Sequence, residues 1–230
     1  MSYQVIEIFD SIEGEGIRQG LPATFIRFAG CNLCCSYCDT KYAYDASKAT
    51  QMTVDEILAK ANQTYKRVTL TGGEPLLQEN LELLVNALID KHIQVNIETN
   101  GSVDWVKFAV KNYSLNLISR SYLFFTVDYK LPSSGQGHKM LVENFKGCSP
   151  CDAIKFVVGS DDDIFTLLNV VASIYNDRKD HERHYQMPHI FLSAVHGKYD
   201  SAKLANLILT EPLLKDAKLM VQLHKVVNIK

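Results

Sequence analysis

The feature that most constrains the fold is an alternation of short apolar runs with segments of helical periodicity, which continues from residue 24 to residue 223. The apolar runs are rich in β-branched and aromatic residues and predict strands at residues 24–28, 67–70, 94–97, 123–127, 153–158, 190–194 and 219–223. Helices are predicted at residues 53–65, 75–91, 103–111, 162–176 and 201–213, and surface insertions at 132–137 and 176–185. Such β–α alternation predicts a parallel sheet with right-handed crossovers.

Six β–α units are too few for a closed eight-stranded barrel, so we expect an α/β fold of the open or partial TIM-like barrel type. About six parallel strands would follow an N-terminal hairpin, in a single domain that spans residues 1–230. Thr53 and Glu56 have the spacing of a capping box, and Pro75 suits the first turn of a helix. Ligands of such sheets bind at the carboxyl ends of the strands.

Composition and charge exclude several classes of function. Hydrophobic residues make up 47% of the chain and charged residues 22%, with a formal net charge of −2. These values are ordinary for a globular domain and give no sign of a nucleic-acid-binding face. No apolar run reaches the roughly 20 residues that span a bilayer, and the N-terminus has no signal-peptide features. We therefore expect a cytoplasmic protein that does not bind membranes.

Four of the six cysteines lie within one stretch of eight residues, Cys31 to Cys38. In a chain expected to be cytoplasmic, this favours metal or redox chemistry over disulfides. Cys31, Cys35 and Cys38 are spaced Cys-x-x-x-Cys-x-x-Cys on the loop that follows the first predicted parallel strand. Three thiolates would leave one iron of a four-iron cluster without a protein ligand. The alternative is a zinc site that uses Cys34 as a fourth ligand.

The cysteine motif, followed by Thr71-Gly72-Gly73-Glu74-Pro75 at a strand end, resembles the radical S-adenosylmethionine (SAM) superfamily. The resemblance implies a partial βα barrel of the radical SAM type and a [4Fe–4S] cluster whose fourth iron is chelated by SAM. It also implies that the Gly-Gly-Glu-Pro segment receives the SAM amino group. Two glycines would allow close backbone approach, and Glu74 would offer an anion to the ammonium.

Nearly the whole chain resembles the 7-carboxy-7-deazaguanine synthase family of queuosine and 7-deazapurine biosynthesis. The motifs are Phe9-Asp10-Ser11-Ile12-Glu13-Gly14-Glu15-Gly16, Gly20-Leu21-Pro22-Ala23-Thr24-Phe25-Ile26-Arg27, Cys38-Asp39-Thr40-Lys41, Glu98-Thr99-Asn100-Gly101, Asp128-Tyr129-Lys130-Leu131-Pro132 and Gln222-Leu223-His224-Lys225. The resemblance implies a lyase that contracts the ring of 6-carboxy-5,6,7,8-tetrahydropterin and releases ammonia. The reaction would proceed through a 5′-deoxyadenosyl radical.

The resemblance also assigns the substrate and cofactor residues. The substrate set is Ile12, Glu13, Gly14, Glu15, Arg27, Thr71, Gln222, His224 and Lys230, the last through its carboxylate. The SAM set is Tyr37, Cys38, Asp39, Gly73, Glu74, Glu98, Asp128, Tyr129 and Lys130, and Thr40 is the implied Mg²⁺ ligand. Arg27 would clamp the substrate carboxylate. Position 13 is usually Gln in this family and is Glu here, which changes the hydrogen bonds available there.

Two alternative functions are an activating enzyme for glycyl-radical enzymes and a non-catalytic zinc module. The Asp39-Thr40 pair and the C-terminal motif with Gln222 and His224 argue against the first. The implied partners are a pterin substrate, a reducing protein such as flavodoxin and a second copy of the chain in a homodimer. Cys34 is expected to be a buried small hydrophobe. Cys148 and Cys151 are expected to be incidental thiols in a loop.

Overall fold

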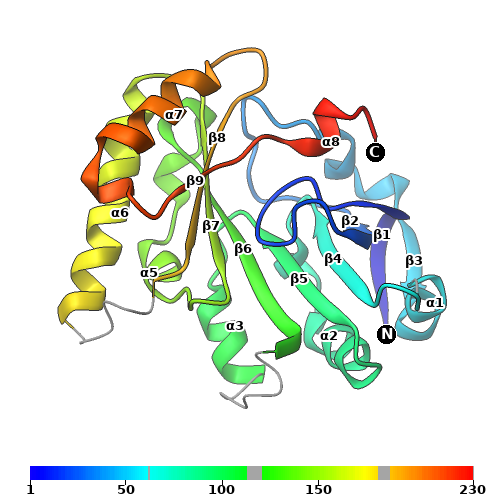
Figure 1. Ribbon diagram of the computed structural model, residues 1–230. Coiled ribbons are helices and arrows are strands. Elements are labelled where there is room, and N and C mark those ends of the chain that lie inside the picture. Colours follow the sequence, from blue (N-terminus) through cyan, green and yellow to red (C-terminus); the bar gives the residue numbers. More distant parts are fainter. Residues whose placement is uncertain (62, 113–120, 181–186, 230) are drawn as a thin grey trace.

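The computed structural model describes residues 1–61, 63–112, 121–180 and 187–229 (Figure 1). One sheet of nine strands, in the order β3-β1-β2-β4-β5-β6-β7-β8-β9, organises the described chain. The strands are β1 Ser2–Ile12, β2 Pro22–Phe28, β3 Thr50–Thr53, β4 Arg67–Gly72, β5 Gln94–Thr99, β6 Leu123–Tyr129, β7 Ala153–Val158, β8 His189–Ala194 and β9 Lys218–Leu219. The helices are α1 Val54–Lys60, α2 Leu81–Asp90, α3 Trp105–Asn112, α5 Val142–Lys146, α6 Asp162–Asp180, α7 Ser201–Thr210 and α8 Leu223–Val226.

The predicted partial barrel is confirmed. Strands β2 and β4 to β8 are six parallel neighbours, and the two-residue β9 extends the parallel part. Strand β1 pairs antiparallel with β2 as the N-terminal hairpin and antiparallel with β3 on its other side. Because β3 and β9 are separate edges of the sheet, the barrel is not closed. No helix among the described residues is long and apolar enough to cross a membrane.

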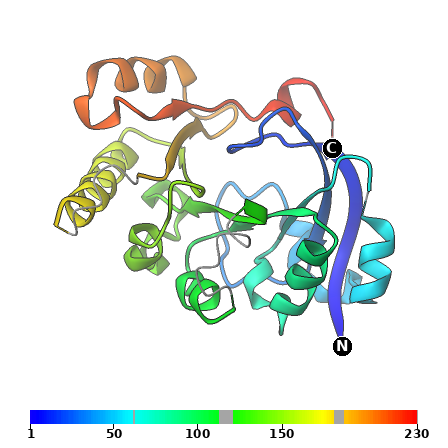
Figure 2. The ribbon, with the colours of Figure 1, turned by 60° about the horizontal axis from the view of Figure 1, so that its bottom comes forward.

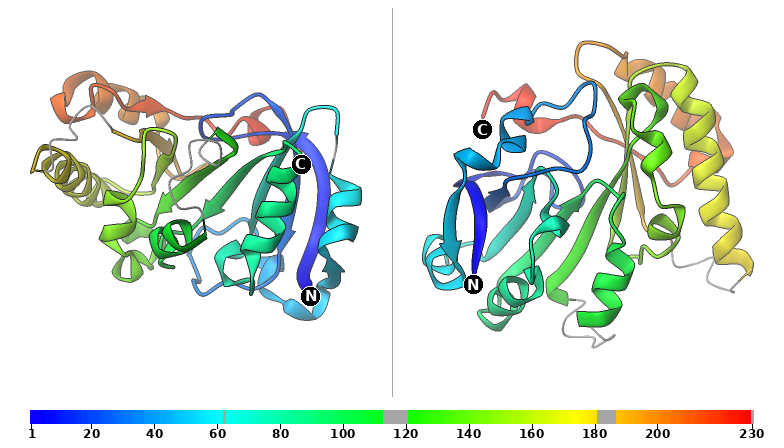
Figure 3. Two further views of the ribbon diagram at one scale, coloured as in Figure 1. Left: turned by 90° about the horizontal axis from the view of Figure 1, so that it is seen from below. Right: turned by 180° about the vertical axis from the view of Figure 1, so that it is seen from behind.

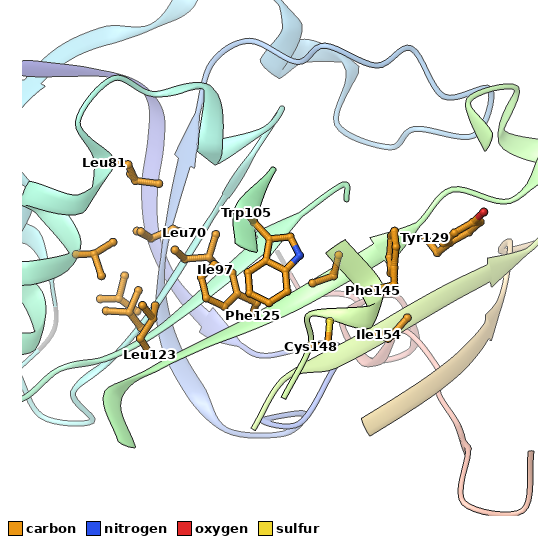
Figure 4. Close-up of a cluster of buried hydrophobic side chains, with 14 of the residues drawn as sticks. Leu70, Leu81, Ile97, Trp105, Leu123, Phe125, Tyr129, Phe145, Cys148 and Ile154 are labelled. Carbon is orange, nitrogen blue, oxygen red and sulfur yellow. The ribbon is translucent and has the colours of Figure 1, made fainter. Parts of the chain in front are cut away.

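The two faces of the parallel strands differ in polarity. Alternate residues such as Leu70, Ile97 and Val127 are buried against the helices, whereas the residues between them are mostly polar. Figure 3 (left) shows α2, α3, α5 and α6 on one side of the curved sheet, with the β1–β2 loop and the C-terminal segment on the other. The helix side forms the main core, in which Trp105 stacks on Phe125 with ring centroids 4.4 Å apart (Figure 4). The opposite, polar side is therefore available for a binding site.

Several element boundaries differ from the predictions for local reasons. The Thr53 capping box is present, but α1 ends at Lys60 rather than at residue 65. The helix predicted at 75–91 is interrupted because Asn80 has a left-handed backbone (φ 54°), so a 3₁₀ turn, Pro75–Leu77, precedes α2. The last predicted strand, 219–223, is wrong, since β9 ends at Leu219 and α8 starts at Leu223.

The two predicted surface insertions are also corrected. Residues 176–180 belong to α6, where Arg178 is buried and donates a hydrogen bond to the Cys148 carbonyl, and residues 181–185 lie outside the described residues. The segment contains the 3₁₀ turn Pro132–Ser134 and leads into a second one, Gly137–Lys139, and Ser134 is buried beneath the cysteine loop. This segment therefore supports the cysteine loop, to which it is hydrogen-bonded, and is not a simple surface insertion.

The helix-side core predicts the outcome of a matched pair of substitutions. Phe156 on β7 is 0% exposed, whereas Phe165 on α6 is 74% exposed. We expect Phe156→Ala to lower the free energy of unfolding by about 3–5 kcal/mol because it leaves a cavity, and Phe165→Ala to change it by less than about 0.5 kcal/mol. Urea denaturation followed by circular dichroism measures both. Equal losses of stability in the two variants would contradict the assignment of Phe156 to the core and Phe165 to the surface.

Candidate active site

The carboxyl ends of the parallel strands surround a cavity of about 420 Å³. Its lining includes these residues named from the sequence: Ile12, Gly14, Glu15, Arg27, Cys31, Cys35, Tyr37, Cys38, Asp39, Thr40, Thr71, Gly73, Glu98, Asp128, Lys130, Gln222 and His224. They come from segments up to 212 positions apart in the chain, between Ile12 and His224. Parallel strands bring these positions together because all of their carboxyl ends lie at the same edge of the sheet.

The three motif cysteines, Cys31, Cys35 and Cys38, all line the cavity. Cys34 is exposed and lies outside it, which corrects the expectation that Cys34 is buried. The backbone N–H of Leu33 and the side-chain amide of Asn100 donate to the Cys31 sulfur, at 3.4 and 3.8 Å. Within the described residues, no three His, Cys, Asp or Glu side chains are grouped closely enough to hold a single metal ion. The three thiols thus line one cavity but are too far apart to bind a single metal ion together.

The cysteine loop packs directly on the glycines at the end of β4. A Cβ added to Gly73 would lie 1.9 Å from the Gly30 carbonyl oxygen and 2.9 Å from Cβ of Cys31. Gly72 has a left-handed φ of 138°, and a Cβ there would overlap the Phe28 backbone. Only glycine can occupy these positions without moving the loop. The two glycines therefore set the height of the cysteine loop above the sheet.

Glu74 does not face the cavity, in contrast to its predicted role toward the SAM amino group. Its carboxylate is fully buried and accepts hydrogen bonds from Thr99 Oγ1 (2.8 Å) and from the backbone N–H groups of Asn100 (2.7 Å) and Leu76 (3.1 Å). Burial raises the pKa of Glu74 to about 7, despite these hydrogen bonds. Glu74 is a structural anchor that joins the ends of β4 and β5.

A second buried carboxylate, Asp163 at the start of α6, supports the other side of the cysteine loop. It accepts hydrogen bonds from the Ser133 N–H (2.9 Å) and hydroxyl (2.5 Å). Ser36, between Cys35 and Cys38, in turn donates its N–H to the Ser134 carbonyl (3.0 Å) and its hydroxyl to the Ser133 carbonyl (2.9 Å). The loop is thus held from both β4 and α6.

Glu13 is also turned away from the cavity, although it was predicted to contact substrate. Its buried carboxylate forms an ion pair and hydrogen bond with Arg18 and accepts a hydrogen bond from Thr69. Arg18 Cζ lies 4.8 Å from the centroid of the Phe124 ring. The Glu in place of the usual Gln therefore has a partner within its own turn. This pair closes the base of the β1–β2 loop inside the barrel.

The predicted site residue Tyr129 lies outside the cavity. Tyr129 is 6% exposed, belongs to the helix-side core and packs against Phe145, with ring centroids 4.7 Å apart (Figure 4). It alternates with Asp128 and Lys130, which do face the cavity, so strand periodicity explains the correction. Lys230 lies outside the described residues, and the preceding Ile229 lines the cavity. Cys148 is buried in the core, and Cys151 is exposed.

A network of charged side chains crosses the cavity and includes Lys155, which the sequence analysis did not identify. Lys155 Nζ lies 2.5 Å from Glu15 Oε2 and 3.1 Å from Asp128 Oδ2, and Asp128 also pairs with Lys130 at 2.8 Å. Burial would lower the pKa of Lys155, but Asp128 and Glu15 outweigh it and raise that pKa. The sequence signal that could have identified Lys155 is that it is the single charged residue within the apolar run Ala153–Val158.

Glu98 also lines the cavity, and it forms no ion pair with any of the described residues. Its carboxylate accepts a hydrogen bond from Thr71 Oγ1 at 2.9 Å. Burial, reinforced by the nearby Glu13 carboxylate, raises the pKa of Glu98 to about 7. A protonated Glu98 at neutral pH can donate a hydrogen bond as well as accept one.

Arg27 stands beside an aromatic wall that was also missed from sequence. Its Nε bonds to Glu7 Oε1 at 2.8 Å, and the Tyr42 hydroxyl donates to the same oxygen at 2.8 Å. Phe9 and Phe25 line the same cavity and stack on each other with ring centroids 5.3 Å apart. Phe9 and Phe25 follow the alternation of β1 and β2, which is the signal that could have found them.

The C-terminal segment covers one side of the cavity. The Leu223 N–H donates to the Gly14 carbonyl (3.0 Å), and Gln222 Nε2 donates to Glu15 (2.5 Å). Lys225 forms an ion pair with Asp39 at 3.0 Å. Figure 2 shows this segment running beside the β1–β2 loop. Burial would raise the pKa of Asp39, but Lys225 and Thr40 outweigh it and lower that pKa to about 2.

The chain is similar to known proteins over nearly its whole length. The model of the Radical SAM superfamily matches residues 25–117. The 7-carboxy-7-deazaguanine synthase of Clostridium acetobutylicum is 40% identical over 230 residues, covering 99% of this chain and 96% of that protein. The chain belongs to the 7-carboxy-7-deazaguanine synthase family. The Methanospirillum hungatei protein of the same name is 36% identical, over 98% of this chain and 86% of its own length.

The fold agrees with membership of this family. The crystal structure of QueE from Escherichia coli aligns with a TM-score of 0.72, at 24% identity, over 97% of this chain and 95% of that one. As a member of the 7-carboxy-7-deazaguanine synthase family, the chain is a radical SAM enzyme that uses a [4Fe–4S] cluster and SAM and acts on a small molecule. The cavity fits these cofactors because it holds three thiols and because, within the described part of the chain, Asp128 Oδ1 is buried without a hydrogen-bond partner.

The cysteine geometry predicts opposite results for two neighbouring substitutions. Cys35→Ala removes a cavity thiol, so we expect the protein to lose the four-iron cluster after anaerobic reconstitution. Cys34→Ala removes an exposed thiol outside the cavity and is expected to keep the iron and acid-labile sulfide content of the unmodified chain. Iron and sulfide analysis with visible absorbance measures both variants. Cluster loss in Cys34→Ala, or zinc in place of iron, would contradict the three-cysteine site.

Proposed function

We propose that the chain converts 6-carboxy-5,6,7,8-tetrahydropterin into 7-carboxy-7-deazaguanine and ammonia in this cavity. The observation that carries the proposal is that one cavity contains the three cysteines together with a guanidinium, Arg27, beside a stacked aromatic pair. Curated relatives with this activity in their name match along nearly the whole chain. Substrate and product differ by one molecule of ammonia, so the conversion needs no net oxidant.

Cys31, Cys35 and Cys38 would hold the cluster, and the end of β4 at Gly73 would receive SAM with Tyr37, Asp39, Glu98, Asp128 and Lys130 around it. When bound, the cluster and SAM supply the radical chemistry that removes a hydrogen atom from the substrate. Asp128 supports this role because its Oδ1 has no hydrogen-bond partner and can accept one from a hydroxyl or amino group of a ligand. Gly73 lines the cavity, so its backbone can contact a ligand there.

The substrate side would be formed by Arg27 and the β1–β2 loop. Glu7 anchors Arg27 through Nε, which leaves the two terminal nitrogens for a bidentate contact with the substrate carboxylate. Phe9 and Phe25 offer flat apolar surface to a pterin ring. Ile12, Gly14, Glu15, Thr71, Gln222 and His224 complete the lining on this side. Burial lowers the pKa of His224, so a neutral imidazole can accept a hydrogen bond from a pterin N–H.

Thr40 is the proposed Mg²⁺ ligand, with substrate oxygens and water as further ligands. Its hydroxyl lines the cavity and donates to Asp39 Oδ1 at 2.9 Å. Mg²⁺ commonly binds one or two protein oxygens and recruits the remaining ligands from substrate and water.

We also propose a homodimer, a reducing protein such as flavodoxin and a cytoplasmic location. The six free cysteines support the reducing location, and family membership supports the partners.

A direct assay tests the proposed reaction. Reconstituted enzyme incubated anaerobically with SAM, dithionite, Mg²⁺ and 6-carboxytetrahydropterin is expected to form 7-carboxy-7-deazaguanine and ammonia in equal amounts, measured by mass spectrometry and an ammonia assay. Omission of SAM or of reductant should abolish both products. Cleavage of SAM without either product would refute the proposed substrate.

The proposed Mg²⁺ site predicts a difference between two variants of Thr40. Thr40→Ser keeps the hydroxyl and is expected to retain most of the Mg²⁺-stimulated rate, whereas Thr40→Val keeps the shape and removes the ligand oxygen. We expect Thr40→Val to lower kcat/KM at limiting Mg²⁺ by about tenfold or more. Initial rates over a Mg²⁺ titration measure this. Identical titrations for the two variants would exclude Thr40 as a ligand.

A further inference from the structure

Lys155 lies at the centre of the cavity wall, on a strand whose other side is fully apolar. Ile154 and Phe156 on either side of it belong to the helix-side core, so strand alternation directs Lys155 to the interior. Its register partner on β6 is Asp128. A buried ammonium is costly unless paired, and this one has two carboxylate partners.

The two partners of Lys155 belong to different halves of the proposed site. Glu15 comes from the β1–β2 loop, 140 positions away in the chain, on the substrate side. Asp128 comes from the end of β6, on the SAM side. Lys155 therefore pairs with one carboxylate from each of these two halves of the cavity.

The two carboxylates depend on Lys155 to different degrees. Asp128 keeps a second ion pair, with Lys130 at 2.8 Å, if Lys155 is removed. Among its described contacts, Glu15 keeps only the neutral amide of Gln222. Without the Lys155 ammonium, Glu15 would also face the Asp128 and Glu98 carboxylates, which already act on the charge of Lys155. Glu15 is thus the carboxylate that loses its charged partner.

From this asymmetry we infer that Lys155 is a positioning residue that attaches the Glu15-bearing loop to the SAM side of the cavity and so sets the substrate pocket. This inference deepens the proposed function and rests on it. Lys155 acts through Glu15 rather than on the reacting atoms. Its removal should therefore weaken the binding of the carboxypterin and leave the binding of SAM in place.

Lys155→Met keeps the side-chain length and removes the charge. We expect its KM for carboxypterin to rise by about tenfold or more, while the Kd for SAM stays within about twofold. More SAM should be cleaved per product formed, because the substrate is held less well against the cofactor. Lys155→Arg, which keeps the charge, should recover pterin binding relative to Lys155→Met. Lys130→Met, which removes a cation paired only with Asp128, should show the opposite pattern, with weaker SAM binding.

A readout on the substrate-free protein, before any cluster is loaded, tests the attachment itself. Arg18 is buried in the β1–β2 loop and is the only trypsin site between residues 1 and 26. Lys155→Met and Glu15→Gln should both accelerate tryptic cleavage after Arg18, detected by mass spectrometry. Lys203→Met on α7, where the side chain is 59% exposed, is the control and should not. If Lys155→Met does not fold, Glu15→Gln serves alone for both measurements.

The inference is overturned if Lys155→Met binds carboxypterin as the unmodified chain does, if it loses SAM and pterin binding equally, or if cleavage at Arg18 is unchanged. The double variant Lys155→Met/Glu15→Gln gives a further test. If its rise in KM equals the product of the rises in the two single variants, the inference is also overturned, because two residues that act through one contact have non-additive effects. Failure of the proposed function is distinguishable: the unmodified chain would then not turn over carboxypterin, whereas the tryptic test would still report on the Lys155–Glu15 attachment.

Discussion

The geometry of the site depends on the hydrogen bonds that the buried residue Glu74 makes. It receives hydrogen bonds from the end of β5, and its own backbone N–H donates to the Gly30 carbonyl of the cysteine loop at 2.8 Å. Three strand ends, those of β2, β4 and β5, therefore meet at one residue. The glycines before it allow this contact, since any side chain at Gly73 would displace the cysteine loop. The Gly72-Gly73-Glu74 segment, predicted to contact a cofactor, thus also supports the cysteine loop from below.

The sequence could predict the fold and the approximate membership of the site, because both follow from strand order. Each motif lies just after a parallel strand, so the sheet itself brings Cys31, Thr71, Glu98 and Asp128 to one edge. The direction of individual side chains could not be predicted in the same way. Glu13 and Glu74 point to buried partners, Arg18 and Thr99, and nothing in the motifs themselves indicates these two pairings. Tyr129 could have been excluded, since strict alternation places it opposite Asp128 and Lys130.

The same alternation explains why Lys155 escaped notice. A strand of six residues with one charge reads as an ordinary buried strand unless the polarity of neighbouring strands is considered together. Across the sheet, however, the interior positions carry Arg27, Thr71, Glu98, Asp128 and Lys155, a consistent polar row. Such a row is stable only when its charges neutralise one another, because each is removed from water. The network is therefore a property of the barrel interior as well as of the chemistry it serves.

The attachment of the Glu15 loop has a consequence for how the protein folds. The two hydrogen bonds of the Glu15 side chain, to Lys155 and to Gln222, join residues 140 and 207 positions apart. Contacts of such long range pay a large loop-closure entropy and form late, after the local β–α units have assembled. The cysteine loop, which contacts nearby β4, can take shape earlier. We therefore expect the half of the cavity proposed to select the substrate to be completed after the cysteine loop during folding.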